Sequence, residues 1–447
     1  MSSYIANHGG GPGHCLSSRT KGTSMPADDA WVEYRKWGKE YGELVYIQDR
    51  NILILNDSRV AIDLLEKRRS HLFGSKNNSN DETPYSDDWR RKRKLFQQNF
   101  RQSAVNRFHP DQYNKALPED NVLCTMGVST SSLKILLHRT RERCLDHGTS
   151  FYSWAFPAIE HFHGCVLCQL GSLDVDLHEW QSNKTGKGTS LIAELASKCE
   201  GDSTEIEAIK AMATTSYLAA ADTTLSSISS FMLSMVLNPD VQAKGQEEID
   251  HIVGTDRLPT FEDRLSLPYV EAIYREVMRL HPPAPLGVEH SSIEDDFYLG
   301  YHIPKGCSVI PNIWYVNCSF YSEASILNTC HFRAMNRDPD VYPRPDDFLP
   351  ERFLDSPGPF TSINDILAYG FGRRVCIGRY MADNTVWLTI ACVLATLNLR
   401  KPKDKQGNDI SISEDYTSGF FRHPKPFQCS ITPRTPYAEK LIIATAS

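Results

Sequence analysis

The stretch Tyr369 to Arg379, YGFGRRVCIGR, is the most informative part of this sequence. It sets Cys376 among three glycines, at positions 370, 372 and 378. Because glycine has no side chain, such a loop lets the backbone approach a flat ligand and direct N–H groups at one atom. A thiolate is what those donors would stabilise, and Arg373 and Arg374 add positive charge that favours the ionised sulfur. Taken alone, the stretch fits a Gly-rich turn with a buried free cysteine equally well.

Two other segments offer charges that could support this loop. Glu276 and Arg279 stand three positions apart on a predicted helix, which is close enough for the two side chains to pair. An exposed pair of this kind is usually solvated and is uninformative by itself. Further along, the segment PERF (350–353) offers a second arginine, Arg352.

A third segment lies in the middle of a long predicted helix. Residues 219–224, AAADTT, put small residues next to Asp222 and Thr223. Small residues let another group pack against the helix backbone, and a threonine inside a helix can hydrogen-bond the carbonyl four residues earlier. Simple helix packing is the alternative interpretation of this segment.

Composition describes an ordinary globular protein. The chain has 447 residues, and its net charge of -7 gives no reason to expect nucleic-acid binding. Its 12 cysteines lack the regular spacing of a disulfide framework. The first thirty residues contain no apolar run typical of a signal peptide or a spanning helix. The most apolar stretch, 385–399, is shorter than the roughly 20 residues that a membrane helix needs, so we expect it to form a buried core helix.

The hydrophobic pattern predicts a mainly helical fold with a small sheet. Thr204 is expected to cap the long helix, with Glu207 in the capping-box position, and Pro239 is expected to end it. Helices are predicted over 31–42, 58–68, 89–99, 204–237, 241–253, 267–280 and 385–399, and two strands within 44–57.

The expected organisation is one large domain. Residues 1–27 are Gly/Ser-rich and predicted to be a disordered segment without a membrane anchor, followed by a single domain over 28–447. Residues 71–84 read as a polar loop, and 114–180 show only weak periodicity.

In this order, the segments resemble the cytochrome P-450 superfamily of heme-thiolate monooxygenases, particularly its fungal members. The resemblance rests on AAADTT, on EVMR followed by LHPPAPLGV (276–288), on PERF and on YGFGRRVCIGR. It is strong over 204–434 and weaker over 28–112. It implies the cytochrome P-450 fold, mainly α with a small β subdomain, in which the middle helices of this chain look shortened.

The resemblance implies a heme b cofactor and a role for each matched residue. Cys376 would be the axial thiolate ligand of the iron, with Gly378 close to the heme. The buried ion network that braces the heme-binding loop would consist of Glu276, Arg279 and Arg352. The heme propionates would be bound by Trp89, Arg93, His290 and Arg374.

The resemblance also implies the reaction. Asp222 and Thr223 would deliver protons for oxygen activation, so that one oxygen atom of O2 enters an apolar organic substrate and the other leaves as water. The substrate side would be lined by Leu286, Gly287, Val288, Phe420 and Phe421, although core packing explains apolar residues there equally well.

The implied partner is a separate NADPH-cytochrome P-450 reductase. A chain that carried its own nicotinamide site would show a Gly-rich fingerprint after a predicted strand, and none is found. By resemblance the protein would lie on the cytosolic face of the endoplasmic reticulum membrane, whereas the expected lack of an anchor is also compatible with a cytoplasmic location.

The sequence departs from the family in several places. The loop 71–84 and the stretch 114–180 do not match the family's substrate-roof helices. The positions of a usual Phe, Gly and Arg are held by Tyr369, Ala220 and Ser291, and the last of these changes removes a possible propionate contact. Because of such departures, an inactive or misassembled family member with impaired heme binding is the alternative to an active enzyme.

A different class of function is a metal-binding module. The segment HFHGCVLC holds its candidate ligands, which are His161, His163, Cys165 and Cys168. It lacks a second ligand pair at matching spacing, so this hypothesis is the weakest of the three.

The sharpest departure is an insert of 19 residues, 315–333, between Trp314 and Ala334. The family runs directly from this tryptophan to the alanine. Trp-Tyr-Val can be encoded with a GTATGT splice donor, and Phe332-Arg333 can be encoded with a YAG acceptor. We therefore interpret residues 315–333 as a translated intron.

Sequencing the mature transcript across this junction tests the interpretation. We expect a message in which the Trp314 codon is followed directly by the Ala334 codon, without the 57 nucleotides that encode the 19 inserted residues at three per residue. A mature message that retains them throughout would show the insert to be genuine protein.

Overall fold

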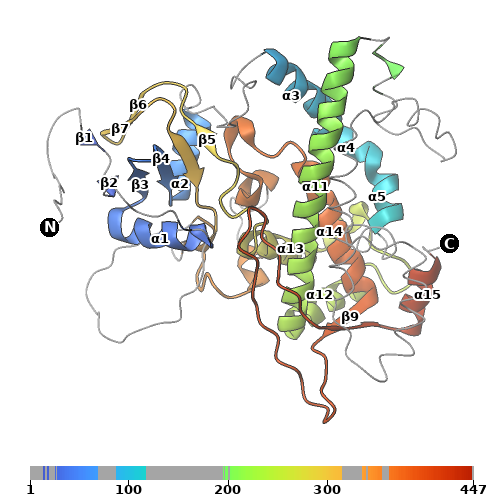
Figure 1. Cartoon of the computed structure of the whole chain (residues 1–447). Helices are drawn as coiled ribbons and strands as arrows, with labels where there is room; N and C mark the ends of the chain where they lie inside the picture. Colours follow the sequence, from blue (N-terminus) through green and yellow to red (C-terminus); the bar gives the residue numbers. More distant parts are fainter. Residues whose placement is uncertain are drawn as a thin grey trace, which may run out of the picture. The chain divides into compact units, whose positions relative to one another are not determined.

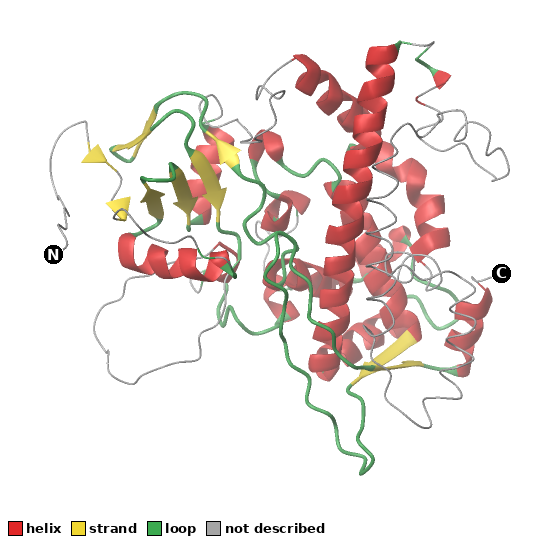
Figure 2. Cartoon of the chain, viewed as in Figure 1, coloured by secondary structure: helices red, strands yellow, loops and turns green. Residues whose placement is uncertain are grey.

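The computed structural model describes residues 14–15, 18–19, 26, 28–68, 87–116, 195, 197–199, 202–314, 335–338, 341–354 and 362–444. The chain divides into two compact units. The first comprises residues 1–89, 272–379 and 416–423, and the second comprises 90–271, 380–415 and 424–447. Figure 2 distinguishes the helices from the strands of both units. Several predicted features lie outside the described residues: the insert 315–333, the loop 71–84 and most of 1–27 and 114–180. The shortening of the middle helices therefore stays a prediction.

The first unit contains a five-stranded sheet whose strand order is β2-β3-β4-β8-β5. The hydrophobic alternation of LVYI and ILIL forms the predicted hairpin, in which Leu44 pairs with Leu55. β4 then pairs in parallel with β8, and β8 pairs with β5, which places His290 opposite Val309. The strands are β2 (Ser18–Arg19), β3 (Leu44–Ile47), β4 (Ile52–Leu55), β5 (His290–Ser291) and β8 (Ser308–Pro311).

The two faces of this sheet belong to two hydrophobic clusters. Successive strand residues point to opposite faces, so Ile54 packs with Trp37 of α1 while Leu53 and Leu55 join the other cluster. That second cluster includes Phe371, two residues beyond the start of the glycine-rich stretch. Figure 1 shows α1 and α2 beside the sheet. Their bounds are α1 (Ala30–Tyr41) and α2 (Ser58–Ile62), and α2 continues as a π-helical turn over Asp63–Lys67.

A smaller sheet of the first unit has the order β1-β7-β6. Its hairpin turns at Leu299 and Gly300, both of which have positive φ, as a two-residue hairpin loop requires. The strands are β1 (His14–Cys15), β6 (Asp296–Tyr298) and β7 (Tyr301–Ile303).

The second unit is helical and contains the long helix α11 (Ser203–Leu237), green in Figure 1. Its 35 residues make a rod about 50 Å long, buried from Thr224 to Val236. The predicted cap is wrong by two residues: the side chain of Asp202 accepts the N–H groups of Thr204 and Glu205. Aspartate caps a helix as well as threonine does. With Asp202 as the cap, the helix begins at Ser203, one residue before the predicted start at Thr204.

The apolar stretch 385–399 forms a core helix, as expected, but its end is a strand. Helix α14 (Arg379–Thr396) is followed directly by β9 (Leu397–Arg400), which pairs antiparallel with β10 (Ser430–Pro433). The buried amide of Gln242 both donates to the carbonyl of Leu399 and accepts its N–H, each at 2.8 Å. The N–H and carbonyl of Leu399 thus find partners on a distant helix. The local sequence pattern did not predict that this part of the chain is extended.

Three further helices agree with the predicted pattern to within a few residues: α3 (Asp87–Phe100), α12 (Pro239–Ile252) and α13 (Pro268–Leu280). Three others were not predicted: α4 (Gln102–Val105), α5 (His109–Ala116) and α15 (Pro436–Ala444). Among the described residues, no helix is both long enough and apolar enough to cross a membrane.

Candidate active site

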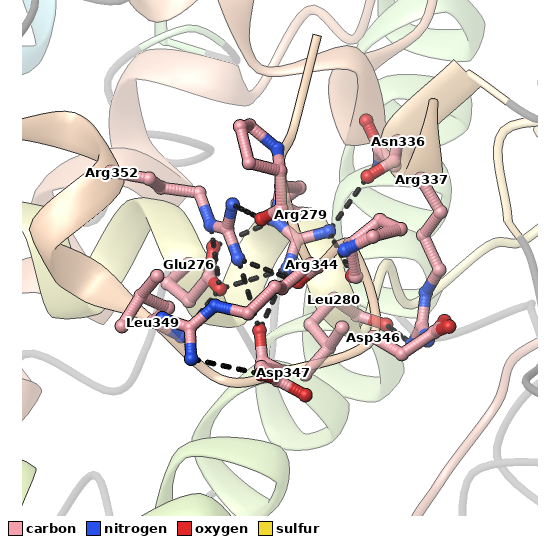
Figure 3. Close-up of polar contacts among 12 residues, drawn as sticks. Glu276, Arg279, Leu280, Asn336, Arg337, Arg344, Asp346, Asp347, Leu349 and Arg352 are labelled. Atoms are coloured by element: carbon pink, nitrogen blue, oxygen red, sulfur yellow. Dashed lines mark hydrogen bonds and ion pairs between the residues drawn. The ribbon is translucent and has the colours of Figure 1, made fainter. Parts of the chain in front are cut away.

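Glu276 on α13 binds two arginines from different parts of the first unit (Figure 3). Arg279 donates to its two carboxylate oxygens, from Nε at 2.7 Å and from Nη2 at 2.8 Å. Arg352 donates from Nε to Oε1 at 3.1 Å. Glu276 is 0% exposed and Arg279 is 4% exposed. The pair with i,i+3 spacing is therefore a buried ion network rather than surface decoration.

Backbone groups satisfy the rest of this network. The N–H of Leu349 donates to Glu276 Oε1 at 2.8 Å, and Nη1 of Arg279 donates to the carbonyls of Asn336 and Pro345. Removing charges from water costs several kcal/mol per ion unless such partners replace the water. Burial lowers the pKa of Arg352, and the charge of Glu276 acts in the opposite direction. The network thus attaches Asn336 and residues 345–352 to α13.

Arg337 makes a second attachment beside the network. Its Nη1 donates to Asp346 Oδ1 at 2.9 Å, and its Nη2 donates at 3.0 Å to the carbonyl of Leu280, the last residue of α13 (Figure 3). A cation at this end of a helix is favourable because the last carbonyls have no partner within the helix.

The loop that carries Cys376 is closed by its own backbone. The N–H of Cys376 donates to the carbonyl of Tyr369 at 2.8 Å, so this donor closes the loop instead of facing the sulfur. Gly370 and Gly372 have φ of 79° and 58°, values that favour glycine. A side chain on Gly372 would collide with the carbonyl oxygen of Leu65. The Cys376 residue itself is exposed.

Tyr369, where the family usually has Phe, has a buried partner for its additional hydroxyl. Its hydroxyl lies 2.9 Å from that of Tyr274 on α13, two residues before Glu276. Sequence reasoning did not select Tyr274. The signal that could have found it was the Phe-to-Tyr departure at 369, because a buried hydroxyl needs a hydrogen-bonding partner.

His290 and Arg374 lie close enough to interact electrostatically. Burial, and next the charge of Arg374, lower the pKa of His290 to about 4. His290 is held at the edge of the sheet by its pairing with Val309, and Arg374 ends a short 3-10 turn two residues before Cys376. Two nitrogen-bearing side chains, one neutral and one cationic, suit a carboxylate ligand.

The second unit holds the two residues predicted to handle protons. Thr223 Oγ1 donates to the carbonyl of Ala219 at 2.7 Å, the bond to the preceding turn expected for a threonine inside a helix. Asp222 and Thr223 are both partly buried. Of the predicted propionate ligands, Arg93 lies half-buried on α3, and Trp89 is described only as part of that helix's backbone.

A cavity of about 740 Å³ lies in the second unit, lined by residues that include Leu95, Cys199 and Ile209. None of the described residues that line it is a predicted site residue. Within the described ranges, no group of three or more His, Cys, Asp or Glu side chains could hold a metal ion. The alternative metal site at 161–168 lies outside those ranges.

Comparison with known proteins identifies relatives of this chain. The family model described as Cytochrome P450 matches residues 175–325 and 327–431. Cytochrome P450 monooxygenase claR of Ampulloclitocybe clavipes is 32% identical, over 94% of this chain and 85% of its own. Cytochrome P450 monooxygenase 136 of Postia placenta is 32% identical, over 92% of this chain and 85% of its own.

A solved structure extends the comparison to the fold. A zebra fish cytochrome P450 with abiraterone aligns with a TM-score of 0.61, covering 92% of this chain and 100% of its own at 21% identity. The predicted fold class, mainly α with a small β part, is thereby confirmed.

Two glycines of the cysteine loop should respond differently to alanine. We expect Gly372→Ala to destabilise the heme-free protein by about 2–4 kcal/mol, because its φ is positive and the new Cβ meets the Leu65 carbonyl. A Cβ on Gly378 meets no atom within 4 Å, so Gly378→Ala should cost less than about 1 kcal/mol. Urea unfolding measures both, and equal losses would contradict the expectation. If Gly378 lies against heme, its variant should instead lower heme occupancy.

Stability should fall in mild acid. The unfolded chain takes up a proton on His290 below its ordinary pKa of 6.5, whereas the folded chain does so only near pH 4. The unfolded state is therefore favoured as pH falls through this window, by about 3 kcal/mol in total. Urea unfolding of the heme-free protein at several pH values should show this loss, and His290→Asn should reduce it. An identical pH slope in the variant would contradict the assignment.

Proposed function

The chain belongs to the cytochrome P450 family, and we propose that it is a heme-thiolate monooxygenase with an apolar organic substrate. Monooxygenases of this family are oxidoreductases that incorporate oxygen from O2, and this chain is one of them. The observation that carries the finer proposal is the placement of Cys376. Cys376 is exposed on a loop that is anchored in the core through Phe371. The hydrogen bond from the Cys376 N–H to the carbonyl of Tyr369 closes this loop.

The residues of the first unit fit a heme. An exposed cysteine offers the thiolate that the iron takes as an axial ligand, and His290 with Arg374 offers partners for a propionate carboxylate. When bound, the heme would supply the iron at which O2 is reduced. The Glu276 network would keep the surrounding loops in place during that chemistry, so its role is structural.

The protein's own contribution begins with the thiolate. A cysteine thiol must lose its proton to act as a ligand, and a nearby cation favours the ionised form. Arg374 stands two positions before Cys376 and supplies such a charge. The positive-φ glycines let the loop turn sharply, and Cys376 stands exposed on this loop.

Thr223 is proposed to hold and pass protons during oxygen reduction. Its hydroxyl donates its hydrogen to Ala219, and its oxygen keeps lone pairs that can accept a hydrogen bond. Asp222 is adjacent and ionisable, so it could replace a proton that Thr223 passes on. The support for this role is the residue pair and its geometry within α11.

The electrons are proposed to come from a separate NADPH-dependent reductase, as in the family generally. Family resemblance also supports placement at the cytosolic face of the endoplasmic reticulum membrane. The absence of a dinucleotide fingerprint in the sequence supports the external donor.

Carbon monoxide tests the ligand. The reduced wild-type protein should give the strongly red-shifted Soret band of a thiolate-ligated heme, and Cys376→Ser should lose it. Cys392→Ser is the matched control, because that thiol is buried on α14 and should leave the band unchanged. A band that survives in Cys376→Ser would overturn the assignment. A wild-type protein that takes up no heme would favour the inactive alternative.

Removing the Thr223 hydroxyl should uncouple electron consumption from oxygenation. In Thr223→Ala we expect product per NADPH to fall about tenfold or more, with hydrogen peroxide released instead. Ser227→Ala is the control, since Ser227 makes the same type of bond one turn later, to the Thr223 carbonyl at 3.1 Å. Unchanged coupling in Thr223→Ala, measured by NADPH and peroxide assays, would show that the hydroxyl does not pass protons.

A further inference from the structure

The side chain of Arg422 lies between two aromatic rings of the first unit. Its guanidinium carbon is 4.1 Å from the ring centroid of Trp314 and 3.7 Å from that of Tyr416. Both distances are well inside the roughly 6 Å limit of a cation–π contact. Arg422 is 9% exposed and Trp314 is 2% exposed, so the stack is shielded from water and from salt.

The same residue is attached through its backbone. The N–H of Arg422 donates to the carbonyl of Pro283 at 2.8 Å, just after α13 ends. Trp314 is bound to the same stretch of chain, because its N–H donates to the carbonyl of Pro285 at 3.2 Å. Tyr416 stacks on His281 with ring centroids 4.9 Å apart. Arg422 is thus the point at which segments 281–288, 313–314 and 416–423 are joined.

Two of these segments carry exposed apolar side chains. Val288 is 65% exposed and Phe420 is 61% exposed, although most large apolar residues in the described part of the first unit are buried. The loop that carries Phe420 is closed at its base, where the N–H of Thr417 donates to the carbonyl of His423 at 2.8 Å. Val288 follows Gly287, whose φ of 57° completes a turn begun at Ala284. Neither side chain is fixed by burial, so its position depends on the base of its loop.

We propose that Arg422 is a positioning residue for substrate specificity, an inference that rests on the proposed function. Its guanidinium, held between Trp314 and Tyr416, sets the Phe420 loop against the segment that carries Val288. The two apolar side chains then meet an apolar substrate in a fixed relative position. Arg422 touches neither the substrate nor the reacting atoms.

Two azoles of different size test this role on the heme-loaded protein. Imidazole reaches only the iron, whereas 4-phenylimidazole adds a phenyl ring that must pack against nearby apolar side chains. Difference spectra give the dissociation constant of each. In Arg422→Met we expect binding of 4-phenylimidazole to weaken about tenfold, while that of imidazole changes less than about twofold. Arg422→Lys keeps the charge without the planar group and should restore part of the loss.

Arg68→Met is the matched control. Arg68 also lies over an aromatic ring, with its guanidinium carbon 5.3 Å from the Tyr298 centroid, but that ring belongs to the β6–β7 hairpin. This variant should leave the binding of both azoles unchanged. Equal weakening of both azoles in Arg422→Met, or no weakening of either, would overturn the proposal.

Amide hydrogen exchange tests the coupling without heme. In Arg422→Met we expect faster exchange both in 416–423 and in 284–288, because one side chain holds the two segments together. Faster exchange confined to 416–423 would show that Arg422 does not position Val288. A wild-type protein that binds neither azole would contradict the proposed function, and the exchange result would still decide whether Arg422 couples the two loops.

Discussion

The first unit depends on the interactions of one buried group, the carboxylate of Glu276. It is surrounded by Arg279, Arg352 and the N–H of Leu349, and no part of it is exposed to water. An isolated charge in such a place would be strongly unfavourable, so the partners are obligatory rather than optional. Arg279 lies one turn along the same helix, whereas Leu349 and Arg352 belong to a segment more than 70 residues later, so satisfying one carboxylate attaches that segment to α13.

The cysteine loop follows a similar principle with uncharged groups. Phe371 is inserted in the core beneath the sheet, Gly372 passes against the Leu65 carbonyl, and the hydroxyl of Tyr369 bonds Tyr274 on the helix that carries Glu276. These contacts leave the loop little freedom while Cys376 stays exposed. This arrangement suits the proposed role of Cys376 as a metal ligand, because its backbone would be positioned before the cofactor binds.

Much of the fold and part of the site could be read from the sequence. The long helix, the β3–β4 hairpin and the acid–arginine spacing on α13 depend on nearby residues, and local patterns predicted them. The cap at Asp202 and the strand over Leu397–Arg400 escaped prediction. The cap differs because Asp202, two residues before Thr204, accepts the N–H groups of the first turn. The strand depends on pairing with β10 and on the side chain of Gln242, 157 residues away.

The sequence by itself determined which residues are candidates for the chemistry: a cysteine among glycines, the charged pair on α13, the second arginine and the threonine inside α11. Such features are defined by residue type and spacing, which a linear sequence contains. Only the tertiary structure decided which of them are buried and which groups they meet. It turned Glu276 and Arg279 from a surface pair into a buried network, and it placed Arg422 between Trp314 and Tyr416. Burial and contact depend on segments distant in the chain, and the same residues in the same order would interact differently in another fold.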